Sequence, residues 1–99
     1  MSWRRKTDKA ILQTLGERVK LARMQANYTQ AQLATKAGVS RRTLQLFEGG
    51  EGGNLTTFIQ LIRALGRIDQ LAELLQPMES ISPLAMLEEQ EKPKQRVRN

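Results

Sequence analysis

The chain has 99 residues and contains neither histidine nor cysteine. A chain of this length folds around one compact core, so we expect a single domain with short tails. Without imidazole and thiol groups the chain cannot supply the usual zinc, copper or iron ligands, a Ser/His pair, a cysteine nucleophile or a disulfide. We therefore expect a protein that is not an enzyme and that uses no metal and no cofactor.

Charge is the second compositional signal. The 16 Lys and Arg residues exceed the 10 Asp and Glu residues, which gives a net charge of +6. Residues 1–50 carry 10 basic and 3 acidic side chains, whereas residues 51–99 carry 6 and 7, so the basic excess lies in the first half. This pattern predicts a polyanionic partner. No apolar run approaches the roughly 18 residues of a membrane span, and the N-terminus lacks the apolar stretch of a signal peptide, so we expect a cytoplasmic protein.

The spacing of apolar residues predicts a series of helices. From Ile11 to Ala26, apolar residues recur at steps of three and four, which is typical of an amphipathic helix beginning near Thr7 or Asp8. Asn27 suits the left-handed conformation that follows a helix end. No segment alternates with a period of two, so no sheet is expected. The predicted fold class is all-α.

Two short helices with clear N-terminal signals come next. Thr29 and Gln32 have the spacing of a capping box, and Gly38, which accepts a positive φ, should end the first of these helices. Ser40 is the expected N-cap of the second, which should run from about Arg41 to Phe47.

The second half begins with a glycine-rich loop, because four of the five residues from 49 to 53 are glycine. Asn54 or Thr56 should cap a fourth helix. The apolar residues expected on its buried stripe are Leu55, Phe58, Leu61, Ile62 and Leu65. Gly66 should end that helix. A fifth helix is expected before Pro77, marked by Ile68, Leu71, Ala72, Leu74 and Leu75.

Two short capped helices joined at a glycine, the second beginning with two arginines, are the parts of a DNA-binding helix-turn-helix. The sequence resembles the phage-repressor (Cro/CI, or XRE) family over about residues 15–75. The residues that carry the resemblance are Thr29-Gln30, Leu33-Ala34, Gly38-Val39-Ser40, Leu44 and Phe47-Glu48 followed by Gly49-Gly50. The resemblance implies a five-helix domain of phage-repressor type.

The same resemblance assigns DNA contacts to the third helix, whose first residues touch base edges. Arg41 and Arg42 are then the base-reading residues, since a guanidinium can donate two hydrogen bonds to guanine O6 and N7. Cations in a first turn oppose the helix dipole, which favours this role over a structural one. Gln30 is expected either to bind a phosphate and brace the recognition helix or to be only a polar first-turn residue. Further candidates for DNA contact are Ser40, Thr43 and Gln45.

The glycine loop and the start of the fourth helix are expected to offer backbone amides to a phosphate, with the helix dipole in the favourable sense. The residues expected to do so are Gly49, Gly50, Gly52 and Asn54. Family correspondence also pairs Glu48 with Arg23 on the first helix, as a structural tie rather than a catalytic group.

Family members extend their specificity by pairing on a palindrome, with half-sites about 34 Å apart on one face of the duplex. The fifth helix carries more apolar residues than one buried face needs. Its surplus, Leu71, Leu74 and Leu75, is therefore the candidate dimer seam of a homodimer.

The tail carries a narrower resemblance. Ile81-Ser82-Pro83-Leu84 and the terminal Lys/Arg-Gln-Arg run are similar to the HipB-like antitoxins that are encoded beside HipA-type serine/threonine kinase toxins. This resemblance implies an autoregulatory repressor on the nucleoid that binds double-stranded operator DNA and also the kinase toxin. The alternatives are an interaction module that mainly sequesters a toxin kinase, a phage-type regulator with no toxin partner, and a nonspecific nucleic-acid-binding protein.

These expectations divide the chain into three parts. Residues 1–9 form a basic arm, residues 10–76 the helix-turn-helix domain, and residues 77–99 a tail that is expected to be flexible when alone and to offer a partner-binding segment. The cluster Arg4, Arg5 and Lys6 of the arm either reaches DNA or only keeps the chain in solution, and Trp3 is expected to pack onto the domain.

Overall fold

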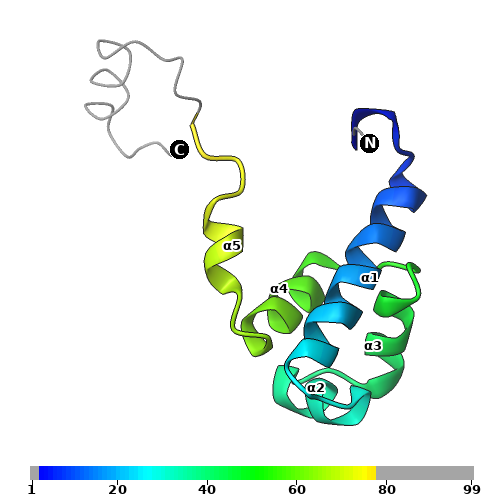
Figure 1. Ribbon diagram of the computed structural model, residues 1–99, viewed down its shortest axis with the longest axis vertical. Helices are drawn as coiled ribbons and strands as arrows, with labels where there is room; N and C mark the ends of the chain where they lie inside the picture. Colours follow the sequence, from blue (N-terminus) through cyan, green and yellow to red (C-terminus); the bar gives the residue numbers. More distant parts are fainter. Residues whose placement is uncertain (1–2, 78–99) are drawn as a thin grey trace, which may run out of the picture.

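The computed structural model describes residues 3–77 of the chain. A 3-10 turn, η1 (Trp3–Arg5), is followed by five α-helices (Figure 1): α1 (Asp8–Gln25), α2 (Gln30–Ala37), α3 (Arg41–Glu48), α4 (Leu55–Ala64) and α5 (Ile68–Ala72). Residues 3–77 contain no strand. The predicted all-α class is therefore confirmed, and the expectations for the tail beyond Pro77 fall outside the described residues.

Side-chain caps explain where the first four helices begin. Each N-cap accepts a hydrogen bond from the backbone N–H three residues further on, and these caps are Thr7, Thr29, Ser40 and Asn54. At α2 the predicted capping box is complete, because Gln32 Oε1 also accepts from the Thr29 N–H at 2.8 Å. Asn27, with φ at 64°, follows the end of α1, and Gly38, with φ at 78°, ends α2.

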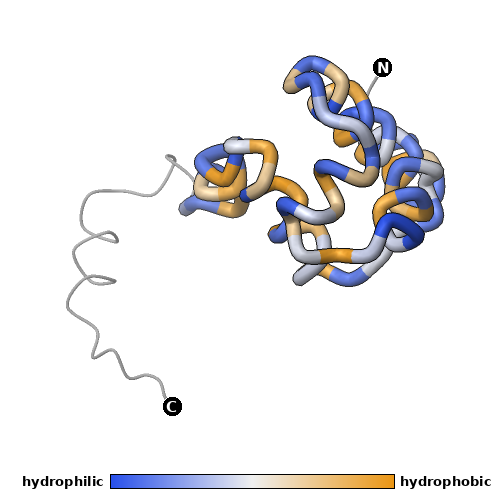
Figure 2. Tube along the Cα trace, turned by 90° about the horizontal axis from the view of Figure 1, so that it is seen from below, coloured by the Kyte–Doolittle hydropathy of each residue, from blue (hydrophilic) through white to orange (hydrophobic). Residues whose placement is uncertain are grey.

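Two expectations for the second half are wrong. Leu55, assigned to the buried stripe of α4, is 68% exposed, because it stands at the first position of the helix and points away from the core that Leu61 enters. The fifth helix ends at Ala72 rather than near Leu75, since Leu74 donates back to Leu71 over three residues and Leu75 takes a positive φ of 58°. Although α5 is rich in hydrophobic residues (Figure 2), it contributes no buried residue.

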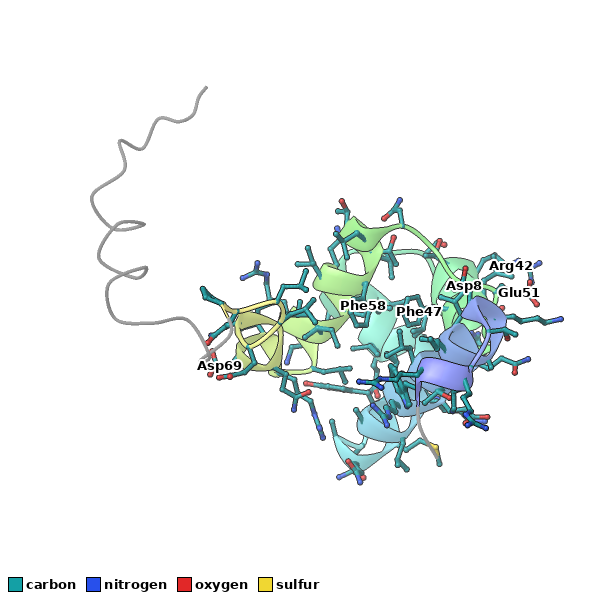
Figure 3. The ribbon with its side chains drawn as sticks, turned by 90° about the horizontal axis from the view of Figure 1, so that it is seen from above. Asp8, Arg42, Phe47, Glu51, Phe58 and Asp69 are labelled. Carbon is teal, nitrogen blue, oxygen red and sulfur yellow. The ribbon has the colours of Figure 1, made fainter. Side chains whose placement is uncertain are left out.

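The hydrophobic core lies where α1, α2, α3 and α4 meet. Its fully buried centre is formed by Leu33 of α2, Leu44 of α3 and Leu61 of α4. Phe47 stacks on Phe58 with ring centroids 5.5 Å apart, and the two rings lie side by side in the interior (Figure 3). One aliphatic core therefore holds both short helices against α1 and α4.

A glycine allows α1 to cross α3 at close range. Gly16 is buried in the middle of α1, where a Cβ would overlap the backbone carbonyl oxygen of Phe47 and would lie only 2.9 Å from that of Glu48. Only a residue without a side chain fits this crossing. Gly16 therefore sets how closely the last turn of α3 approaches α1.

Candidate nucleic-acid interface

The start of α3 projects three polar side chains from the surface of the domain. Arg41, Arg42 and Gln45 are exposed, whereas Leu44, Phe47 and Glu48 on the opposite side are buried. Figure 3 shows Arg42 at the outer edge of the molecule, on the opposite side from Asp69 of α5. The predicted base-reading residues therefore lie together on one exposed face.

Arg41 and Arg42 have no partner in the described part of the chain. Within residues 3–77, neither the Arg41 nor the Arg42 guanidinium forms a hydrogen bond, an ion pair or a ring contact. Both occupy the first turn of α3, which has no acidic residue to offset them. Two cations at the positive end of a helix are unfavourable for the helix itself.

A hydrogen-bond chain braces this face from behind. Gln30, the first residue of α2, donates through Nε2 to Glu48 Oε1 at 3.1 Å. Its Oε1 accepts from Gln45 Nε2 at 3.4 Å. The half-buried Gln30 thus connects the exposed side chain of Gln45 to the buried end of the same helix. The expected tie between Gln30 and the third helix is present, and the role of Gln30 in binding a phosphate remains a prediction.

Glu48 is the buried anchor of that chain. Arg23 of α1 donates to Glu48 through Nε at 2.7 Å and through Nη2 at 3.2 Å. A third donor of the same guanidinium, Nη1, reaches the carbonyl oxygen of Tyr28 at 2.9 Å, just before α2. The expected pairing of Glu48 with Arg23 is confirmed. Because these bonds satisfy both charged groups, the pair links α1, the turn before α2 and α3.

Ser40 and Thr43 hold the first turn of α3. Ser40 Oγ accepts from the Thr43 N–H at 2.9 Å and lies 2.8 Å from Thr43 Oγ1, to which it donates. The Ser40 side chain is therefore committed to the cap. Thr43 is only half exposed, so Arg41, Arg42 and Gln45 present the larger contact surface.

The glycine loop offers fewer free amides than its sequence suggests. The N–H of Gly49 donates to the carbonyl oxygen of Gln45, and that of Gly50 donates to Phe47. Gly50 is also buried against Gln13 of α1. Neither amide is available to a phosphate, so the expected set narrows to Gly52 and Asn54, whose N–H groups have no acceptor within residues 3–77.

The candidate dimer seam lies away from this interface. Leu71 of α5 is half-buried, whereas Leu74 and Leu75 are 64% and 94% exposed. Figure 1 places α5 on the far side of α4 from α3. The apolar surplus of this region therefore remains open to a second molecule without obstructing α3.

The N-terminal arm packs onto α1. The ring of Trp3 lies 4.9 Å from the Arg18 guanidinium carbon and 5.8 Å from Lys6 Nζ, and Lys6 Nζ donates to Thr14 at 2.9 Å. The expectation that Trp3 packs onto the domain is confirmed.

Sequence reasoning missed two features of this site. One is the Gln45–Gln30 hydrogen bond, for which two polar residues 15 positions apart gave no local signal. The other is Gly16, which did give a signal, because a glycine inside a helical pattern indicates close packing.

Two further findings concern residues 3–77 alone. None of their helices has both the length and the apolar character that crossing a membrane requires. They also bring no three His, Cys, Asp or Glu side chains together in a cluster that could bind a metal ion.

A small helical domain in which one short capped helix braces a second helix led by free arginines is a DNA-binding domain of the kind found in transcriptional regulators. The chain matches the family model of the helix-turn-helix domain over residues 14–75, more than half of its length. The protein therefore belongs to the helix-turn-helix domain family.

Proposed function

We propose that this protein is a homodimeric transcriptional repressor that binds a palindromic site in double-stranded DNA and excludes the polymerase. The observation that carries the proposal is the pair of arginines at the exposed start of α3, Arg41 and Arg42, which have no partner within the described residues. Their guanidinium groups have the geometry to read guanine O6 and N7 in the major groove.

Specific recognition also requires side chains that are held in place. Gln45 is tied through Gln30 to the buried Glu48, so part of the contacting face is oriented before DNA arrives. Preorganised contacts lose less entropy on binding than mobile ones. In this proposal, Gln30 and the amides of Gly52 and Asn54 bind phosphates and fix the domain on the duplex.

One short recognition helix contacts only a few base pairs, so specific binding favours a dimer. Leu74 and Leu75 are exposed, which supports assigning them, with Leu71, to the self-association surface. A dimer that binds a palindrome needs its two α3 helices in successive major grooves, about one helical turn or roughly 34 Å apart.

Substitution of each arginine tests the proposal. The full chain first selects a duplex from a random library. The affinities of Arg41→Ala and Arg42→Ala for this duplex and for a random duplex are then measured. Arg63→Ala, in the last turn of α4, is the control. Each α3 variant should bind the selected duplex more weakly than the wild type does, by about 1–3 kcal/mol. Unchanged discrimination between the two duplexes in both α3 variants would exclude α3 as the recognition helix.

A narrower function is that of the autoregulatory antitoxin of a HipA-kinase-type operon, acting on the nucleoid in the cytoplasm. Its support is the sequence Ile81-Ser82-Pro83-Leu84, which lies outside the described residues. The test is to co-express the chain with a kinase encoded beside it. Toxicity that is relieved by the full chain but not by residues 1–77 would support a partner-binding tail, and no relief would exclude the antitoxin role.

A further inference from the structure

A hydrophobic groove of about 370 Å³ lies between α1 and the α4–α5 region. Its apolar lining comes from Leu15, Leu21 and Ala22 of α1 together with Phe58, Ile62 and Leu65 from α4 and its end. No residue of α2 or α3 lines it, so it is distinct from the proposed DNA-binding face.

The groove opens onto a wider apolar surface. Leu21 at its edge is 56% exposed, and Met24, one turn further along α1, is also exposed. Exposed apolar side chains at the mouth of a groove gain free energy when an apolar partner covers them. The groove is therefore suited to binding a segment with apolar side chains.

The rim of the groove is basic. Arg18 and Arg67 line it, and none of its lining residues is acidic. Arg67 Nη2 donates to Gln25 Oε1 at 3.2 Å across the groove, between the start of α5 and the end of α1. The charge of this rim favours an occupant with an apolar centre and acidic flanks.

The chain itself contains such a segment directly after the described residues. In residues 79–89, the apolar residues Ile81, Leu84 and Leu87 recur every three positions, with Glu79 before them and Glu88 and Glu89 after them. The segment thus combines regularly spaced apolar residues with acidic ends.

The segment also lies close to the groove in sequence. Gln70 of α5 lines the groove, and Ile81 follows it by eleven positions. Because the segment is tethered beside the groove, its effective concentration there is in the millimolar range, an advantage that a free ligand does not have.

We propose that residues 79–89 dock into the groove between α1 and α4–α5 of their own chain. Ile81, Leu84 and Leu87 cover the apolar floor, and the glutamates face Arg18 and Arg67. This inference rests on the fold and does not depend on the proposed DNA binding, because α3 stays exposed.

Paramagnetic NMR on the full chain tests the docking. Because the chain has no cysteine, Ser82→Cys provides a single site for a nitroxide label. The backbone signals of Leu21, Ala22 and Ile62 should lose most of their intensity, whereas those of α2 should keep theirs. A label at the exposed Thr35→Cys of α2 is the matched control and should give the reverse pattern.

A second variant separates docking from chance proximity. Leu84→Asp with Leu87→Asp in the Ser82→Cys chain should restore the signals around the groove, since charged side chains cannot cover its floor. Full groove intensity in the labelled Ser82→Cys chain, or unchanged broadening in the double-aspartate variant, would overturn the proposal. So would broadening of the groove signals when isotope-labelled and spin-labelled chains are mixed, both carrying Leu74→Asp and Leu75→Asp to remove the proposed dimer, because the occupant would then be the tail of a second copy.

Discussion

Arg23 of α1 and Glu48 of α3 form a buried ion pair with 2.7 Å between Nε and Oε2, although 25 residues separate them. Their side chains are only 11% and 4% exposed. The same carboxylate accepts from Gln30, which holds Gln45 on the candidate DNA-binding face. A single buried charge pair therefore connects the packing of α1 to the orientation of a candidate DNA contact.

Removing one member of this pair should destabilise the domain strongly. Glu48→Ala leaves the Arg23 guanidinium buried without its counter-ion, which typically costs about 3–5 kcal/mol. Urea unfolding followed by circular dichroism measures the loss. The double variant Arg23→Met, Glu48→Leu should lose less stability than the sum of the losses in Arg23→Met alone and Glu48→Leu alone, because no buried charge then stays unpaired. Additive losses would show that the two side chains act independently.

A methyl group at Gly16 should push α1 away from α3. Gly16→Ala places a Cβ against the carbonyl oxygens of Phe47 and Glu48, both of them backbone atoms that cannot turn aside. Overpacking of this kind costs about 1–3 kcal/mol. The neighbouring exposed substitution Glu17→Ala is the matched control and should change the free energy of unfolding little. Equal stability of the two variants would contradict the close crossing.

A change that keeps the charge of Arg42 should separate specific from nonspecific binding. Arg42→Lys retains a cation but loses the planar fork that pairs with guanine. Affinity for the selected duplex should fall by about 1–3 kcal/mol while affinity for random duplex stays the same. Fluorescence anisotropy at several salt concentrations measures both. If the two affinities fell together, Arg42 would be a phosphate contact rather than a base contact.

The start of α4 offers a substitution that keeps the cap and changes the charge. Asn54→Asp should cap α4 as well as asparagine does, since Asp and Asn are equally good N-caps and an anion suits the helix dipole. If this turn binds a phosphate, the new carboxylate repels it. DNA affinity should then fall, and the slope of log affinity against log salt should decrease by about 0.9, the contribution of one phosphate. Asn54→Ser is the neutral control. Equal DNA affinity in the two variants would remove this turn from the interface.

The exposed leucines after α5 should control self-association. Leu74→Asp with Leu75→Asp should convert a dimer to a monomer in sedimentation equilibrium, because two charges would be buried in the seam. The melting temperature at a concentration where the wild type is monomeric should not fall, since both side chains are exposed in the single chain. A dimer that persists in this variant would place the seam elsewhere.

Most helix boundaries could be predicted because their signals are local. The caps Thr29 and Ser40 act on backbone groups three residues away, so sequence neighbours were enough to find them. Leu55 and the end of α5 were mispredicted for a related reason. Hydrophobicity alone does not tell whether a residue at a helix end faces the core, and α5 contacts too little of the domain for packing to extend it.

The sequence by itself determined the all-α class, the capped helix pair and the two arginines that lead α3, because each depends on residues within one or two turns. Only the tertiary structure decided that α3 packs closely against α1 at Gly16 and that Gly50 is buried on Gln13. It also decided that Gln30 links Gln45 to Glu48 through hydrogen bonds. These relationships join residues that are far apart in the chain. They depend on the distances and angles at which helices cross, and a local pattern carries no record of either.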